Sequence, residues 1–328
     1  MIKYIVLGFM LLSINITAVA LPTAKLTLSV VDESGMPVES AKVGMSFSLP
    51  PRIGEGPDSV RTVKRGVTDA QGVFTASNET QKYIGYTIRK KGYYLTTGKV
   101  TAYTGVSGVL GLRRWEPWNP TLEVVLKKKI NPIALYVRNM EKLLSRNWID
   151  FPVVDEFVGY DLIARDWVVP YGQGTHRDFL LRFEKHRTTA RRDYHVTLTV
   201  QFPNEGDGIQ SYYDEAGVGS DLRLPHHAPT SGYLNEVVVN RERSPDKRSK
   251  PENKRNREDQ NYFFRVRTEK DEKGNIVSAL YGKMHGGFDL VKFKKKNSTG
   301  KIRFSYYLNP TPNDTNLEFD PIKNLFND

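Results

Sequence analysis

Short runs in which apolar and polar residues alternate recur along this chain, and turn signals rich in glycine, proline and aspartate separate them. In the first run, Leu26, Leu28 and Val30 alternate with polar residues. This period of two gives a strand one buried face and one solvated face. Seven further strands are predicted in the second half of the chain, at residues 179–186, 194–202, 233–241, 262–268, 276–283, 288–294 and 301–308. We therefore expect a mainly β protein.

Twenty residues precede this β pattern, and their composition is typical of an export signal. Lys3 supplies a charged start, residues 5–12 are apolar, and Ala18-Val19-Ala20 ends the segment. Small residues at the first and third positions before a cut suit signal peptidase. The apolar stretch is too short for a comfortable membrane span. We expect residues 1–20 to be removed, which leaves a secreted or periplasmic protein without a transmembrane segment.

The 328 residues include no cysteine. This excludes a lipoprotein anchor, disulfide bonds, thiolate metal sites and a cysteine nucleophile. An exported protein of this length must then be stabilised by its apolar cores. At roughly 100–200 residues per domain, the chain predicts two domains.

Positive charge is concentrated in one segment. The formal net charge is +11, and residues 241–258 carry eight basic against four acidic residues. A segment with so few apolar residues is typical of a solvated loop. The alternative interpretation is that this loop binds a polyanion. Nucleic acid is not the expected partner, because export separates the protein from it.

The first domain contains an ordered set of strand and turn residues. In chain order these are Val31-Asp32, Gly35, Pro37-Val38, Ala41–Val43, Thr68-Asp69, Gly72, Phe74, Tyr86 and Lys91-Gly92-Tyr93. Glycine supplies positive φ in tight turns, and proline presets the entry to a strand. This set, within residues 25–128, resembles the carboxypeptidase regulatory-like (transthyretin-like) family. The resemblance implies an Ig/transthyretin-like β-sandwich that acts as a spacer, stabiliser or adhesive unit without catalytic residues of its own.

The sequence predicts one helix, which would connect the two domains. Asn131 suits a cap and Pro132 the first helical position, and apolar residues then recur at helical spacing as far as Leu144. We assign residues 129–149 to this helical connector. Residues 150–328 are predicted to form an antiparallel β-rich domain, as a meander, sandwich or open barrel. This layout is similar to that of uncharacterised secreted bacterial proteins.

Two groups of residues are candidates for ligand binding. In the first domain, Trp115 and Trp118 flank a turn, where they would either stack on a sugar or partner, or cover one end of the sandwich. In the second domain, the polar-aromatic stretch with Asp166, Trp167 and Tyr171 is typical of sugar-binding clefts. Asp161 and Asp166, five residues apart, would face opposite sides of one strand, which argues against a paired-carboxylate site. His176 and His226 complete the candidate ligand-binding set.

No catalytic, metal or cofactor motif occurs at a diagnostic spacing. The leading hypothesis is an exported, non-enzymatic binding or structural protein whose partner is a protein, a glycan or an envelope polymer. The alternative is a secreted hydrolase whose site assembles from distant residues of the second domain. A pocket that brings His176, His195 or His226 within hydrogen-bonding distance of a carboxylate would favour the enzyme. The oligomeric state stays open.

Overall fold

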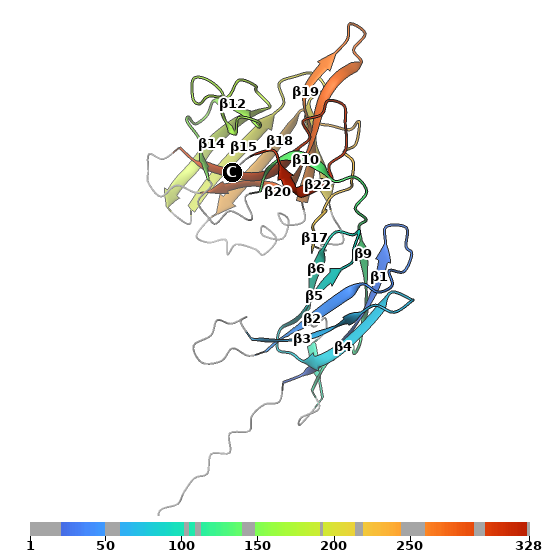
Figure 1. Ribbon diagram of the computed structural model, residues 1–328. Coiled ribbons are helices and arrows are strands. Elements are labelled where there is room, and N and C mark those ends of the chain that lie inside the picture. Colours follow the sequence, from blue (N-terminus) through green and yellow to red (C-terminus); the bar gives the residue numbers. More distant parts are fainter. Residues whose placement is uncertain are drawn as a thin grey trace, which may run out of the picture. The chain divides into compact units, whose positions relative to one another are not determined.

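A computed structural model describes residues 21–49, 60–101, 105–108, 113–139, 148–190, 193–213, 219–243, 260–291 and 299–326. Within these ranges every regular element is a strand (Figure 1), which confirms the expected β class. No helix in this part of the chain is long and apolar enough to cross a membrane. The predicted signal segment, residues 1–20, and most of the basic segment, from residue 244 onward, lie outside the described residues.

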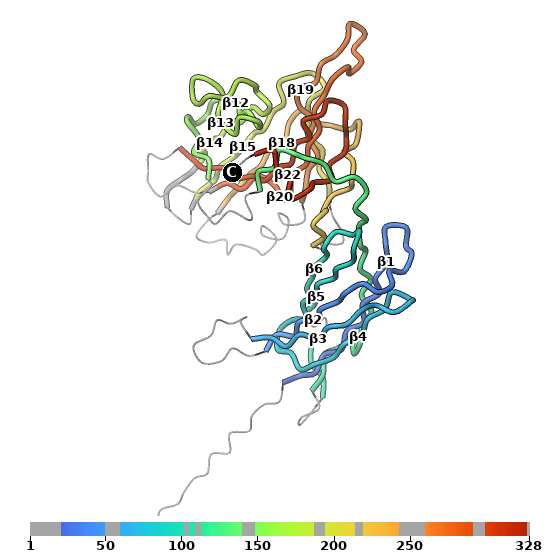
Figure 2. Tube along the Cα trace, viewed as in Figure 1, coloured from blue at the N-terminus to red at the C-terminus, as the bar shows by residue number. Residues whose placement is uncertain are grey.

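The chain divides into two compact units. The first contains residues 1–91 and 97–126, and the second contains residues 92–96 and 127–328. The chain therefore crosses between the units three times, and Figure 2 allows the trace to be followed through these crossings.

Two sheets build the first unit. Its strands are β1 (Thr23–Asp32), β2 (Lys42–Ser48), β3 (Arg61–Val67), β4 (Val73–Glu79), β5 (Tyr83–Arg89), β6 (Thr96–Thr101), β7 (Gly105–Ser107), β8 (Arg114–Glu116) and β9 (Thr121–Leu126). One sheet has the order β4-β1-β8-β7, and β9 also pairs with β1 in parallel. The other contains β6-β5-β2-β3. Alternate residues of β1 and β2 are buried, among them Leu26, Leu28, Met45 and Phe47, so the period of two in the sequence places one face of each strand in the core.

Gly72 lies where the β3–β4 turn approaches β1. Its φ is +74°, and an added Cβ would lie 2.3 Å from the carbonyl oxygen of Val30. We expect Gly72→Ala to lower the free energy of unfolding by at least about 3 kcal/mol, since positive φ and a clash with backbone combine. The matched control is Gly35→Ala, because Gly35 has φ +81° with nothing within 4 Å. Only the conformational term of about 1 kcal/mol applies there. Equal losses in urea denaturation would contradict this prediction.

The second unit is larger and also contains two main sheets. Its strands are β10 (Ile133–Arg138), β11 (Ile149–Asp150), β12 (Phe157–Asp161), β13 (Asp166–Trp167), β14 (Phe179–Ala190), β15 (Asp193–Gln201), β16 (Gly208–Tyr213), β17 (Gly219–Ser220), β18 (Glu236–Arg243), β19 (Gln260–Lys270), β20 (Ile276–Val291), β21 (Lys301–Leu308) and β22 (Phe319–Asn324). The large sheet has the order β16-β19-β20-β21-β10-β22, with β11 on β21. The small sheet has the order β13-β12-β14-β15-β18.

The two sheets of the second unit share one apolar core. Phe179, fully buried on β14 of the small sheet, lies at its centre. Its ring contacts Phe264, Phe288 and Phe304 of the large sheet at centroid distances of 5.5 to 6.2 Å. The sheets therefore pack face to face through interdigitated aromatic rings, which prefer tilted and edge-on contacts.

The predicted helix at residues 129–149 is wrong for the part that the structure describes. Ile133–Arg138 forms strand β10, which pairs antiparallel with β21 and parallel with β22. Leu135 and Val137 alternate into the interior, so the same apolar residues also satisfy a period of two. Pairing on both sides of β10 supplies the backbone hydrogen bonds that a short isolated helix would have to make alone. Residues 140–147 lie outside the described residues.

Candidate functional site

Four of the sequence-predicted site residues, Asp166, Trp167, Tyr171 and His176, lie in one segment of the second unit. We call residues 166–176, which hold these candidates for ligand binding, the binding loop. Asp166 organises its first half: Oδ1 accepts from the backbone N–H of Trp167 at 2.8 Å and Oδ2 from that of Gln173 at 2.9 Å. The backbone N–H of Gly174 donates to the carbonyl of Trp167 at 2.9 Å. The loop is thus closed by its own hydrogen bonds.

The side chains of the binding loop divide into buried supports and exposed groups. Trp167 is buried, packs on Phe151 and Tyr160, and donates from Nε1 to the carbonyl of Asp150 at 3.0 Å. Val169 and Tyr171 are 66% and 42% exposed. Two large side chains therefore face solvent on a segment whose backbone is held by hydrogen bonds.

The far end of the binding loop rests on a buried carboxylate. Asp161 Oδ2 accepts from the backbone N–H groups of Thr175 and His176, each at 3.0 Å. Its Oδ1 accepts from those of Ile163 and Ala164 at 2.9 and 3.0 Å. Burial raises the pKa of Asp161, but these backbone hydrogen bonds and the nearby Arg267 outweigh it, so the pKa is lowered overall. The carboxylate stays ionised and holds the loop.

Arg267 neutralises Asp161 together with a second buried carboxylate. Its guanidinium binds Asp178 through Nε at 2.8 Å and Nη2 at 2.9 Å, and Nη2 also donates to Asp161 at 3.1 Å. The side chains of Asp161 and Asp178 are only 3% and 0% exposed. Arg267 itself has φ +57°, and Asp207 accepts from its backbone N–H at 3.1 Å. The binding loop is thereby connected to β19 of the large sheet.

The expectation that Asp161 and Asp166 face opposite sides of one strand is wrong. They do not lie on opposite sides of a single strand, because they are directly paired across the β12–β13 hairpin. Both carboxylates are nevertheless occupied by backbone donors, so they support the loop. The sequence did not indicate Arg267, whose partners lie 89 and 106 residues away along the chain. No local pattern signals such a contact.

The contacts given for His176 and His226 do not have the arrangement of a catalytic relay. A relay requires one ring nitrogen on the nucleophile and the other on a carboxylate. His176 uses the same nitrogen, Nδ1, at 2.9 Å from Thr175 Oγ1 and 3.6 Å from Asp161 Oδ2. His226 Nε2 lies 2.8 Å from the carbonyl of Lys128 and 3.8 Å from Glu318. His195 contacts the ring of His186, at a centroid distance of 4.6 Å.

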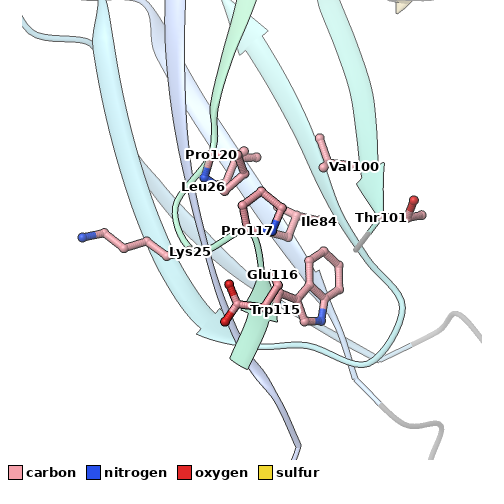
Figure 3. Close-up of a pocket in the computed structure, with 9 residues that line it drawn as sticks. All are labelled: Lys25, Leu26, Ile84, Val100, Thr101, Trp115, Glu116, Pro117 and Pro120. Atoms are coloured by element: carbon pink, nitrogen blue, oxygen red, sulfur yellow. The ribbon is translucent and has the colours of Figure 1, made fainter. Parts of the chain in front are cut away.

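The tryptophan pair lies in the first unit, apart from the binding loop in the chain. Trp115 is buried and lines a small pocket of about 10 Å³, with Ile84, Val100 and Pro117 around it (Figure 3). This volume accommodates about one water molecule. Trp118 is 39% exposed and carries the guanidinium of Arg114 at 5.9 Å from its ring centroid. Of these two tryptophans, Trp118 is the one with an exposed ring.

No group of three or more metal-ligating side chains gathers among the described residues. Of the basic segment, the structure describes Arg241 to Arg243 in β18. The guanidinium of Arg241 is paired with Asp289 at 2.9 Å and donates to the carbonyl of Leu290. Asp289 also pairs with Arg303 at 2.7 Å, so two guanidinium groups share this one carboxylate.

Comparison with known proteins gives little guidance. No family model and no curated protein matches the chain. Among solved structures, 3-chlorocatechol 1,2-dioxygenase from Rhodococcus opacus 1CP is 14% identical, with a TM-score of 0.26 over 34% of this chain and 61% of that one. Chlorocatechol 1,2-dioxygenase from Pseudomonas putida is 15% identical, with a TM-score of 0.25 over 33% and 61% of the two chains. The dioxygenase domain of a dioxygenase carbohydrate-binding protein fusion from Streptomyces sp. SirexAA-E is 10% identical, with a TM-score of 0.25 over 35% and 86%.

The chain covers less than two thirds of the length of the first two of these structures. At such low TM-scores the similarity carries no argument about function. The candidate site therefore rests on the geometry of this chain alone.

Proposed function

We propose that this is an exported, non-enzymatic binding protein that recognises a glycan or protein partner through the binding loop of its second unit. The observation that carries the proposal is the exposure of Val169 and Tyr171 on a loop held by buried ionic and backbone contacts. Ordering a flexible loop on binding costs free energy, and a loop that is already ordered avoids that cost. An exposed tyrosine supplies a large contact area with few rotatable bonds.

The first unit is proposed to be a carboxypeptidase regulatory-like sandwich that acts as a spacer or stabiliser. Its turn residues support this assignment. Asp32 accepts from the backbone N–H groups of Ser34 and Met36, and Asp69 from those of Gln71 and Val73. Both are tight turns closed by an aspartate, and a glycine with positive φ follows each aspartate three residues on.

The binding loop is tested by Tyr171→Ala in the mature protein, applied to arrays of bacterial envelope polysaccharides and to immobilised envelope proteins. We expect the best-binding polymer or protein to lose about 10-fold or more in affinity, since truncation of a central tyrosine removes much of a contact. Tyr213→Ala is the matched control, because Tyr213 is 63% exposed on β16, away from the loop in the chain. Unchanged affinity of the Tyr171 variant, or equal losses in both variants, would overturn the proposal.

Export is tested separately by sequencing the amino terminus of the protein from its native host. A mature terminus directly after Ala20 supports it. Intact Met1 on a membrane-bound chain would overturn it.

A further inference from the structure

The outer face of the large sheet carries a buried lysine without a carboxylate partner. Lys283 on β20 is 1% exposed and forms no ion pair with any described residue. Its Nζ lies 5.2 Å from the ring centroid of Tyr307, the residue opposite it on β21. Met284, its neighbour, faces the shared core instead. Lys283 therefore points away from that core, into the layer that covers the other face of the sheet.

His285 lies on the same face, two residues further along β20. It is 7% exposed, its ring is 4.5 Å from that of Tyr307, and its Nε2 has no hydrogen-bond partner. A buried cationic side chain and an orphan imidazole nitrogen both cost free energy. Two buried titratable side chains that each lower stability, side by side on one strand, are a candidate for a functional role.

The other charged groups that act on Lys283 and His285 belong to segments outside β20. Lys127 and Glu318 act electrostatically on Lys283, and Lys127 and Arg223 act on His285. Lys127 Nζ is held by the carbonyl groups of Arg223 and Leu224 at 3.0 and 3.2 Å. Glu318 is the carboxylate that acts on Lys283, and Asp221 and Asp320 act with it on the nearby Tyr94. We call Lys127, Lys283, His285, Tyr307 and Glu318 the latch cluster.

The carboxylate of Glu318 accepts hydrogen bonds from both segments at which the chain passes between the units. These crossing segments are residues 92–96 and 127–131. Tyr94 Oη donates to Glu318 Oε2 at 3.0 Å. The backbone N–H groups of Ile130 and Asn131 donate to the same carboxylate at 3.0 and 3.1 Å.

The crossing segments are also bound to each other and to the loop above β20. Tyr94 N–H donates to the carbonyl of Lys127 at 2.9 Å, and Lys129 N–H to that of Gly92 at 2.8 Å. His226 Nε2 lies 2.8 Å from the carbonyl of Lys128. Through Glu318, these paired segments are therefore linked to the latch cluster.

We propose that the latch cluster is an acid-sensitive device that fastens the crossing segments to the second unit at neutral to alkaline pH and loosens them as the pH falls. Burial, followed by the positive charge of Lys127, lowers the pKa of Lys283 to about 7, while Glu318 acts in the opposite direction. Burial and the charges of Lys283, Arg223 and Lys127 lower the pKa of His285 as well, so the imidazole stays neutral. Protonation of Lys283 adds a buried cation beside Lys127, and opening of the segment allows water to solvate it.

Hydrogen exchange at pH 6.0 and pH 8.5, corrected for the pH dependence of chemical exchange, tests this device on the full-length mature protein. Local opening of residues 92–96 and 127–131 is expected to increase roughly 10-fold at the lower pH, because opening then captures a proton that the closed state excludes. The hairpin around residues 271–275 serves as an internal reference that should not change.

Two variants separate the latch from a general acid effect. Lys283→Met should abolish the pH dependence of the crossing segments, whereas Lys301→Met, at an exposed lysine of β21, should retain it. The proposal is overturned if the wild-type crossing segments show no pH dependence, if all of the second unit opens equally, or if Lys283→Met retains the wild-type profile. If Lys283→Met does not fold, the pH dependence of opening in the wild-type protein decides the test.

Discussion

Replacing Arg267 with methionine is expected to destabilise the second unit by about 3–5 kcal/mol, because it leaves two buried carboxylates without their cation. Arg267 binds Asp178 through two nitrogens and reaches Asp161 at 3.1 Å. The matched control is Lys270→Met, whose ion pair with Glu205 lies at the surface, where Glu205 is 87% exposed. That pair is worth less than about 1 kcal/mol. Urea denaturation of the three proteins measures the difference.

The same replacement should change the response to acid. The folded pKa of Asp161 is lowered, so its contribution to stability is present above the unfolded pKa and is lost as the pH falls through the folded value. Without Arg267 the folded pKa of Asp161 rises, and the acid-unfolding midpoint should move to higher pH. Adding Asp178→Asn to the Arg267 variant should recover part of the stability, since one unpaired charge is removed. A loss no larger than that of Lys270→Met would contradict the role of Arg267.

The strands could be predicted because their signals are local. The turn at Asp271–Asn275 was expected from its sequence, and Asp271 accepts there from the backbone N–H groups of Lys273 and Asn275, with φ +82° at Gly274. Alternation placed β14, β15 and β19 in the same way. Residues 276–283 and 288–294 were predicted as two strands, but 276–291 form the single strand β20. Both signals depend on residues within a few positions of each other, so a single sequence contains them.

The errors arise where partners distant in the chain decide the structure. Ile133–Arg138 satisfies both helical and strand spacing, and the choice depends on β21 and β22, more than 160 residues later. The residues of the binding loop could be predicted from local composition, but the distant residues that hold the loop could not. Only the packing of the sheets reveals that Lys283 and Glu318 are buried. The partly exposed Arg267 likewise joins two buried carboxylates that lie far from it in the chain.

Replacing Lys283 with methionine is expected to raise the free energy of unfolding at pH 7 by about 4 kcal/mol, the opposite sign to the Arg267 variant. The two residues contrast because Arg267 is neutralised by two carboxylates, whereas Lys283 has none within hydrogen-bonding distance among the described residues. Methionine has a similar length and no charge to desolvate, so it keeps the contact with the Tyr307 ring and removes the penalty.

The pH dependence gives this prediction its sharpest test. Because burial lowers the folded pKa of Lys283 to about 7, the unfolded chain binds a proton that the folded protein lacks between pH 7 and the ordinary lysine value. The stability of the wild type should therefore rise by about 3 kcal/mol from pH 7 to pH 9.5, and the methionine variant should lack this rise.

The comparison is limited to pH values below about 10 by two buried tyrosines. The pKa of Tyr160 and of Tyr262 is raised to about 12 in the folded protein. Deprotonation of these tyrosines in the unfolded chain therefore lowers stability above pH 10. Parallel pH profiles of the two proteins in urea denaturation would show that Lys283 is solvated as an ordinary ammonium group, and the Lys301→Met profile should follow that of the wild type.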